Sequence, residues 1–162
     1  MRLLLLILIT SFCSNDLHSQ AVYDSIDFKK ICVNGIYLGS KKEEVTMKFG
    51  DPQKIVTTEG APGKDIFSNY YYGKSTIRVS PASIFNGFKL TESNFALRYD
   101  REYIKVGDSL KEFALNYPAS FQAYAKDAGG KFKLRIKGGN SYIVFKTKDG
   151  IISEIEIKEE TP

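Results

Sequence analysis

One pattern occurs twice in this chain. Residues 38–52 run Leu-Gly-Ser-Lys-Lys-Glu-Glu-Val-Thr-Met-Lys-Phe-Gly-Asp-Pro, and residues 106–118 run Val-Gly-Asp-Ser-Leu-Lys-Glu-Phe-Ala-Leu-Asn-Tyr-Pro. Both contain an apolar residue, a glycine, a helix-capping residue, a charged first turn, a short amphipathic helix, an aromatic residue and a proline stop. An internal repeat constrains a fold more than any single motif does. It predicts two copies of one unit, each opening with a helix.

Caps and apolar spacing predict the two helices. In the first copy Ser40 and Glu43 form a capping box, and Val45 and Phe49 lie four residues apart on one face. In the second copy Asp108 is the predicted cap, and a buried face follows the spacing i, i+3, i+4, i+7. The residues of that face are Leu110, Phe113, Ala114 and Tyr117.

Short strands separated by turns are predicted through the rest of the first half. Asn34-Gly35 signals a hairpin in which Cys32 and Tyr37 share one face. Gly73-Lys74 signals another, whose register pairs Tyr70 with Ile77 and leaves a second face to Tyr71, Thr76 and Arg78. The predicted strands cover residues 28–33, 54–58, 66–72, 75–80 and 88–97, the last one bent near Glu92.

The second half contains the clearest strand. Residues 131–137 alternate basic and apolar side chains without interruption, which predicts a strand with one buried face formed by Phe132, Leu134 and Ile136. A turn at Gly139-Asn140 then sets Phe145 opposite Leu134. Residues 121–126 fit either a helix or a strand, and alignment on residues 54–58 favours the strand.

The last connection is chosen from the side-chain pattern. A two-residue turn at Asp149-Gly150 would set Phe145 opposite Glu154, and a slip of one residue turns every side chain to the wrong face. We therefore expect a three-residue loop over residues 148–150, which pairs Phe145 with Ser153.

These elements predict an α+β fold in which two helix-then-antiparallel-strand repeats share one antiparallel sheet, with the helices on one face. The predicted divisions are a signal peptide at 1–19, a first repeat with an additional N-terminal strand or hairpin at 20–100, a second repeat at 101–158 and a tail at 159–162. Each half has only about 60 residues, a size at which a separate core is marginal, so a shared sheet is favoured.

The order of elements, the Phe-Gly-Asp-Pro stretch at 49–52 and the spacing from Phe145 through Asp149-Gly150 to Ile155 carry a resemblance. Over residues 36–158 the chain resembles the SmpA/OmlA group of small bacterial envelope proteins and the tandem-repeat β-lactamase inhibitor proteins. The resemblance implies a long sheet with one open face, and a protein that binds other proteins without catalysis. The inhibitors' paired cysteines and partner-contacting residues have no counterpart here.

The N-terminus has the features of an export signal. Arg2 precedes an apolar run over residues 3–12, which has signal-peptide length and is too short to span a bilayer. Cleavage is expected after Ser19, giving a periplasmic or extracellular protein. Lipid modification of Cys13, which would anchor the chain to a membrane, is the alternative, but the bulky Phe12 before it argues against a lipoprotein signal.

Composition argues against most catalytic chemistry. His18 is the only histidine and leaves with the signal, so neither a Ser-His pair nor a zinc site is expected, and no cofactor is predicted. Cys32 would then be the remaining cysteine, which excludes a disulfide within the chain. The formal net charge of +4 is too small to indicate nucleic acid as a partner. The chain is therefore predicted not to be an enzyme.

The predicted binding surface is the sheet face opposite the helices. Its candidate partner-binding residues are Tyr71, Arg78, Lys133, Arg135, Tyr142 and Lys146. Tyrosine and arginine are enriched at the energetic centres of protein interfaces, so the first hypothesis is a non-enzymatic protein-binding module, an envelope assembly factor or inhibitor. The alternative is a basic face that binds anionic glycan or lipid headgroups. A solvated sheet face is the ordinary state against which both are weighed.

The export hypothesis is tested by the mass of the processed protein. We expect intact-mass spectrometry of the exported form to show a chain that begins at Gln20, and Cys13→Ser to leave this processing unchanged. A chain that begins at a lipid-modified Cys13, and loses its anchor in the variant, would contradict cleavage after Ser19.

Overall fold

The computed structural model describes residues 22–58, 66–127 and 130–159. These ranges hold three α-helices, one 3-10 helix and twelve strands in two sheets. The helices are α1 (Lys42–Phe49), α2 (Leu110–Leu115) and α3 (Pro118–Lys126), with the 3-10 turn at Phe28–Lys30. The strands are β1 (Ser25–Ile26), β2 (Ile31–Val33), β3 (Ile36–Tyr37), β4 (Lys54–Thr58), β5 (Phe67–Tyr72), β6 (Ser75–Val79), β7 (Phe85–Leu90), β8 (Ala96–Tyr99), β9 (Glu102–Lys105), β10 (Lys131–Ile136), β11 (Ser141–Lys148) and β12 (Ile151–Glu159).

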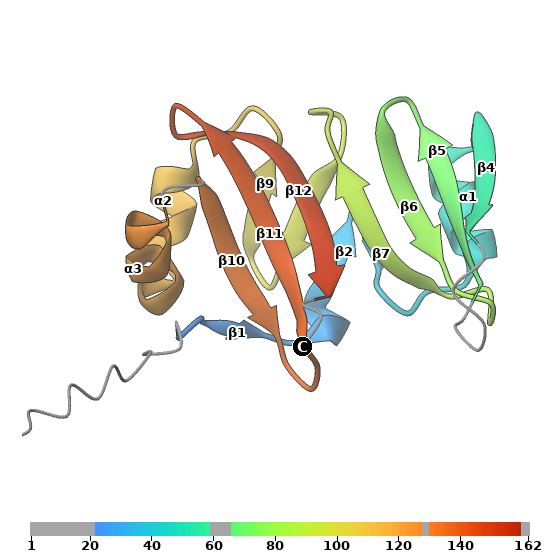
Figure 1. The fold of residues 1–162 in the computed structure, drawn as a ribbon. Helices are drawn as coiled ribbons and strands as arrows, with labels where there is room; N and C mark the ends of the chain where they lie inside the picture. Colours follow the sequence, from blue (N-terminus) through green and yellow to red (C-terminus); the bar gives the residue numbers. More distant parts are fainter. Residues whose placement is uncertain (1–21, 59–65, 128–129, 160–162) are drawn as a thin grey trace, which may run out of the picture.

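Eight strands form a large sheet in the order β1-β10-β11-β12-β7-β6-β5-β4 (Figure 1). All neighbours pair antiparallel except β1, which pairs parallel with β10. The central pair, β12 with β7, is joined through Ile155 opposite Leu90 and Glu156 opposite Lys89. The sheet therefore contains strands from both halves of the chain.

A second sheet corrects the predicted fold class. Strands β3, β2, β8 and β9 form a separate four-stranded sheet, so the described chain is not two helix-strand repeats on one sheet. It holds much more strand (49%) than helix (20%). In Figure 1 this small sheet lies behind the middle of the large one, with α1 behind one end and α2 and α3 beside the other. The prediction fails because residues 88–97 do not form one bent strand: β7 ends at Leu90, and β8 belongs to the small sheet.

The core fills the space between the two sheets and the helices. Buried residues of the small sheet, such as Ile31 and Leu97, belong to the same apolar cluster as Ile143 and Phe145 of the large sheet. At the α2–α3 end Phe132 is the centre of an aromatic group. Its ring lies 5.6 to 6.4 Å from those of Phe113, Tyr117, Tyr124 and Phe145.

The repeated segments make matching backbone contacts. Gly39 donates to the carbonyl of Phe85 and Phe85 donates to that of Ser40, both at 2.8 Å. The second copy repeats this: Gly107 donates to Ile152 and Ile152 to Asp108, both at 2.9 Å. Both glycines have φ near +95°, a conformation that L side chains rarely adopt. Each copy therefore fastens the chain before a helix to the start of a central strand.

These contacts move both helix caps by one residue from their predicted positions. Lys41, not Ser40, precedes the first helix, and Glu44 rather than Glu43 reaches back to the Lys41 N–H at 3.2 Å. Ser109, not Asp108, is the second cap and accepts from the Lys111 N–H. Ser40 and Asp108 lie outside the helices, and their carbonyls accept hydrogen bonds from Phe85 and Ile152 of the central strands.

Residues 121–126 form a helix and not the expected strand. Pro118 does not simply end α2, because it occupies the first turn of α3, where its missing N–H costs nothing. Phe121 and Tyr124 then share the face that packs on the core. The other predicted features of α2 are confirmed: Leu110, Phe113, Ala114 and Tyr117 are buried.

Two hairpin registers differ from their predictions. Leu134 pairs with Ile143 rather than Phe145, a shift of two residues that keeps every side chain on its predicted face. The β11–β12 connection is the rejected two-residue turn at Asp149-Gly150, where both residues have positive φ. A bulge between Lys146 and Thr147 restores the pattern and sets Phe145 opposite Ile155. The registers at Tyr70–Ile77 and Cys32–Tyr37 are confirmed.

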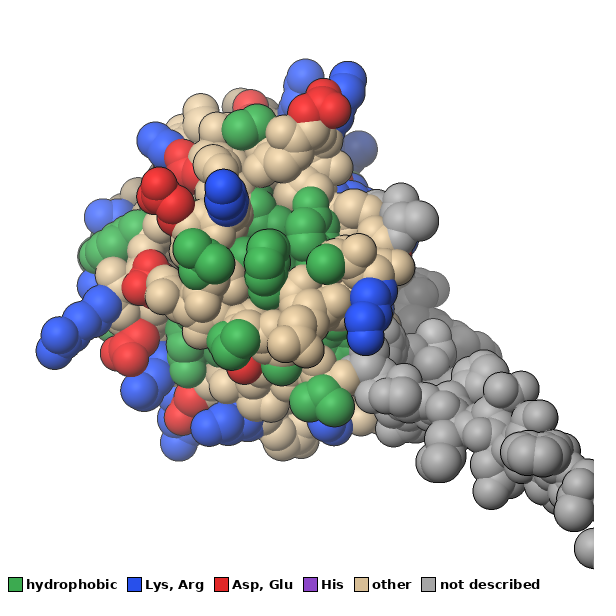
Figure 2. Space-filling view, turned by 90° about the vertical axis from the view of Figure 1, so that its left-hand side faces the viewer, with side chains coloured by type: hydrophobic (Ala, Val, Ile, Leu, Met, Phe, Trp, Pro, Cys, Tyr) green, Lys and Arg blue, Asp and Glu red, His purple; other side chains and the backbone are tan. Residues whose placement is uncertain are grey.

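The end of the molecule that carries α2 and α3 exposes some apolar surface (Figure 2). Hydrophobic side chains gather there among scattered charged groups, and Leu115 on α2 is 61% exposed. No helix among the described residues is long and apolar enough to cross a membrane.

The aromatic group gives a stability prediction. We expect Phe132→Ala to lower the free energy of unfolding by about 3–5 kcal/mol, because a fully buried ring is removed and a cavity left. The matched variant Leu115→Ala removes an exposed side chain and should change it by no more than about 0.5 kcal/mol. Urea unfolding measures both. Equal effects of the two substitutions would contradict the assigned core.

Candidate functional site

One face of the large sheet is left uncovered by the described helices and by the small sheet (Figure 1). We call it the open face. Strand registers align one row of its side chains across seven strands, and the row ends at Lys133 on β10. From β4 onward it comprises Lys54, Tyr71, Thr76, Lys89, Glu156, Val144 and Lys133. The face therefore runs without interruption through both halves of the chain.

The first half of the open face carries an aromatic–cation cluster on β5, β6 and β7. The Arg78 guanidinium lies 5.3 Å from the centre of the Phe67 ring and is opposite Gly87 in register. A Cβ on Gly87 would come within 2.8 Å of the Arg78 Nε and Nη2 atoms, so the absent side chain leaves room for the guanidinium to lie against the sheet. Beside it, the Lys54 ammonium lies 5.9 Å from the centre of the Tyr71 ring.

A belt of ion pairs crosses the middle of the open face. Glu154 binds Lys89 at 3.0 Å and Lys146 at 2.5 Å, and Glu156 binds Lys146 at 3.3 Å and Lys158 at 3.1 Å. The two carboxylates are largely buried, whereas the lysines are partly exposed. Three lysines of this face are thus already paired with carboxylates.

The belt shifts the titration of its own groups. Burial by itself would raise the pKa of the Glu154 carboxyl, but hydrogen bonds from Lys146 and Lys89 outweigh burial, and the pKa lies below its ordinary value. The hydrogen bond to Glu154 correspondingly raises the pKa of Lys146. Both shifts favour the charged forms of the pair.

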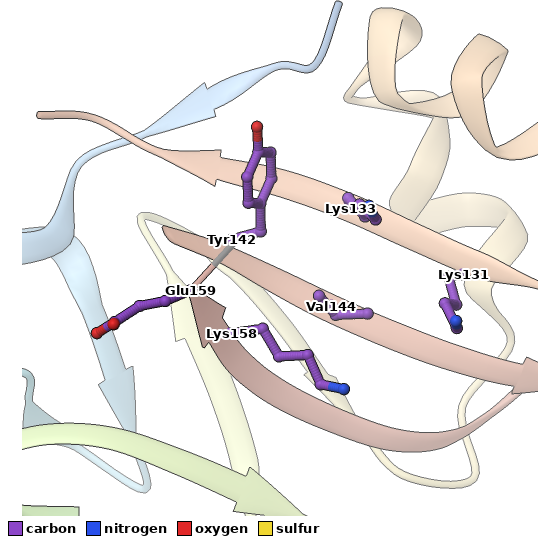
Figure 3. Close-up of a pocket in the computed structure, with 6 residues that line it drawn as sticks. All are labelled: Lys131, Lys133, Tyr142, Val144, Lys158 and Glu159. Atoms are coloured by element: carbon purple, nitrogen blue, oxygen red, sulfur yellow. The ribbon is translucent and has the colours of Figure 1, made fainter. Parts of the chain in front are cut away.

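The second half of the open face carries another aromatic–cation cluster. The rings of Tyr23 and Tyr142 meet edge to face at 5.4 Å, and the Lys133 ammonium lies 5.7 and 5.6 Å from their respective centres. A shallow hollow of about 160 Å³ adjoins this cluster. Figure 3 shows its lining residues, which are Lys131, Lys133, Tyr142, Val144, Lys158 and Glu159. It is smaller than the 300–1,000 Å³ typical of drug-sized ligand pockets.

The predicted site residues share the open face but fall into separate groups. Tyr71 and Arg78 lie on β5 and β6, Lys133 and Tyr142 form the second cluster, and Lys146 belongs to the belt. The sixth, Arg135, is exposed and sits opposite Ser25 at the β1 edge.

Tyr23 belongs to the second cluster but could not be found from sequence, because residues 20–30 carry no strong local pattern. It reaches this face because β1 pairs with β10, more than a hundred residues away.

A further arrangement on the outer face of the small sheet was also missed. The Arg98 guanidinium lies between two rings, 5.6 Å from the centre of Tyr37 and 5.7 Å from that of Tyr103. One terminal nitrogen donates to the Tyr103 hydroxyl at 3.1 Å and the other to the Tyr37 hydroxyl. The Tyr103 hydrogen bond is the main cause that raises the pKa of Arg98 above its ordinary value. We call Tyr37, Arg98 and Tyr103 the Tyr–Arg–Tyr stack.

The described part of the chain holds one cysteine, which lies on β2 of the small sheet. Cys32 is free and fully buried, opposite both Tyr37 and Arg98 in register, and Cys13 lies outside the described residues. The described ranges contain no disulfide and no cluster of three or more His, Cys, Asp or Glu side chains arranged to hold a metal ion.

Comparison with protein-family models, curated proteins and solved structures finds no match to this chain. The resemblance to the SmpA/OmlA group therefore remains a hypothesis.

The belt gives a pH prediction. Because the pKa of Glu154 is lowered by folding, its stabilising contribution is present above its ordinary pKa of 4.5 and is lost as the pH falls through the lower folded-state value. We expect the free energy of unfolding to fall more between pH 6 and pH 3 in the wild type than in Glu154→Gln. Urea unfolding at both pH values measures this difference. A larger fall in the variant would show that the carboxylate is not stabilised by its lysines.

Proposed function

We propose that this chain is a non-enzymatic, exported protein-binding module, of the assembly-factor or inhibitor kind, that holds its partner on the open face. The observation that carries the proposal is the presence of two aromatic–cation clusters on one uncovered sheet face, on either side of the ion-paired belt. Large aromatic rings and arginine dominate the energetic centres of protein interfaces.

The side chains of both clusters are already held in place by neighbouring residues before a partner binds. Arg78 is held against Phe67 above Gly87, and Tyr142 is held by Tyr23 and Lys133. Side chains that are fixed before binding lose less conformational entropy when a partner arrives. Both clusters lie on one continuous sheet, and the strand registers set their separation.

The alternative, a basic face for anionic glycan or lipid headgroups, has weaker support. The hollow lined by Lys131, Lys133 and Lys158 favours it. However, Lys89, Lys146 and Lys158 are paired with Glu154 and Glu156, so the face is less basic than its sequence indicates. Export and a non-catalytic role rest on the leader sequence and on His18 as the only histidine.

The proposal is tested by capture from a bacterial envelope extract followed by mass spectrometry. We expect the immobilised wild type to retain a partner that Tyr71→Ala/Tyr142→Ala loses, with at least a tenfold weaker Kd for the purified partner, or about 1.4 kcal/mol. The matched control is Met47→Ala/Leu115→Ala, which truncates two exposed apolar residues outside the open face. Thermal unfolding checks that all three proteins are folded.

The two function classes give different results in this assay. Lys133→Glu/Arg135→Glu, together with higher salt, should abolish binding to an anionic glycan or lipid and weaken an aromatic protein contact less. Retention of the same proteins by the wild type, the tyrosine variant and the control would overturn the open face as a binding surface.

A further inference from the structure

The outer face of the small sheet carries a fixed positive charge with no negative partner. Among the ion pairs of the described residues, none involves Arg98. Strand register and alternation assign Cys32, Tyr37, Ala96, Arg98, Tyr103 and Lys105 to this face, and none of them is acidic. Glu102 pairs with Tyr99 on the other face. The nearby Asp100 carboxylate at the β8–β9 turn is already paired with Lys30 at 3.8 Å.

The Tyr–Arg–Tyr stack has hydrogen-bond donors that are not used within the protein. A guanidinium has five N–H groups, and the two tyrosine hydroxyls accept one from each terminal nitrogen. Each terminal nitrogen therefore keeps a second N–H. Because each phenol oxygen accepts from Arg98, its own O–H is left to donate. The Arg98 Nε has no hydrogen-bond partner and is itself buried, so the terminal nitrogens are the ones available to a ligand.

Both rings of the stack are accessible to a partner. Tyr103 is 65% exposed and Tyr37 is 41% exposed, and Arg98 is held between their rings. The row that contains it crosses all four strands, from Tyr37 on β3 through Cys32 and Arg98 to Tyr103 on β9. A planar cation fixed between two rings matches the flat, bidentate acceptor of a carboxylate.

We propose that the Tyr–Arg–Tyr stack is a second docking site, separate from the open face, which receives an aspartate or glutamate side chain from an acidic segment of a partner protein. The carboxylate accepts from the two remaining terminal N–H groups of Arg98, and the phenol O–H groups of Tyr37 and Tyr103 donate to it from either side. This site does not depend on the proposed function of the open face.

The test is a titration of the purified protein with acetylated, amidated hexaglutamate, followed by NMR of the arginine Nε–H signals and the backbone amides. We expect a saturable shift at the Arg98 Nε–H that hexaglutamine does not produce. Arg98→Lys keeps the positive charge but loses the two parallel N–H donors of the guanidinium. It should weaken hexaglutamate binding, measured from the Tyr103 amide shift, by about tenfold or more. Tyr37→Phe/Tyr103→Phe keeps both rings but removes the phenol O–H donors, and should weaken hexaglutamate binding severalfold.

Lys105→Gln is the matched control, because it removes a charge from the same face outside the stack. It should change the affinity less than Arg98→Lys does. Two results would overturn the proposal by showing that the effect is one of general surface charge. One is an equal NMR shift at Arg98, Lys105 and the basic residues of β10. The other is unaltered hexaglutamate binding in Arg98→Lys.

Two further outcomes would also overturn it. If inorganic phosphate shifts the Arg98 signal and hexaglutamate does not, the site does not receive a protein carboxylate. The second outcome is that neither the wild type nor Arg98→Lys responds to hexaglutamate, while the variant has a lower melting temperature. The stack would then serve only to shield the buried Cys32 from solvent.

Discussion

The pairing of β7 with β12 is the interaction on which the rest of the molecule depends. Only two residue pairs join these strands, Ile155 with Leu90 and Glu156 with Lys89, yet they connect the four strands on one side to the four on the other. Ile155 and Leu90 are fully buried, and the Lys89–Glu154 ion pair spans the junction on the open face. The repeated segments fasten the start of each of these two strands. Without this junction the two aromatic–cation clusters would not share a surface.

The small sheet explains how the helices are distributed. It supplies Ile31, Val33, Leu97 and Ile104 to the common core behind the middle of the large sheet, so helices are needed only toward the ends (Figure 1). This cover buries one face of the large sheet and leaves the other available. It also creates a second exposed surface, the outer face that carries the Tyr–Arg–Tyr stack.

Sequence patterns correctly predicted the features that depend on neighbouring residues, namely strand alternation and tight turns. The alternation over residues 131–137 and the turn at Gly73-Lys74 fixed which side chains face outward, and six candidate residues were correctly assigned to one face. The failures come from distant contacts. Ser40 and Asp108 are not caps because their carbonyls bind strands more than forty residues away.

The bulge at Lys146 and Thr147, which makes the two-residue turn acceptable, leaves no signature in the sequence. Tyr23 and Arg98 were missed for the same reason as the caps. Their surroundings are assembled by pairings of β1 with β10 and of β2 with β8, which no local pattern reports.

The position of β1 has a consequence for the order in which the chain acquires its structure. Asp24 exchanges two hydrogen bonds of 2.9 Å with Ser120 on α3, and Ser25 and Ile26 pair with Arg135 and Ile136. The first described strand therefore cannot be placed until the chain has been synthesised as far as Ile136. Contacts of such large sequence separation form slowly because a long loop must close first. Until β10 and α3 have formed, residues 24–26 lack the partners that hold them in the folded protein.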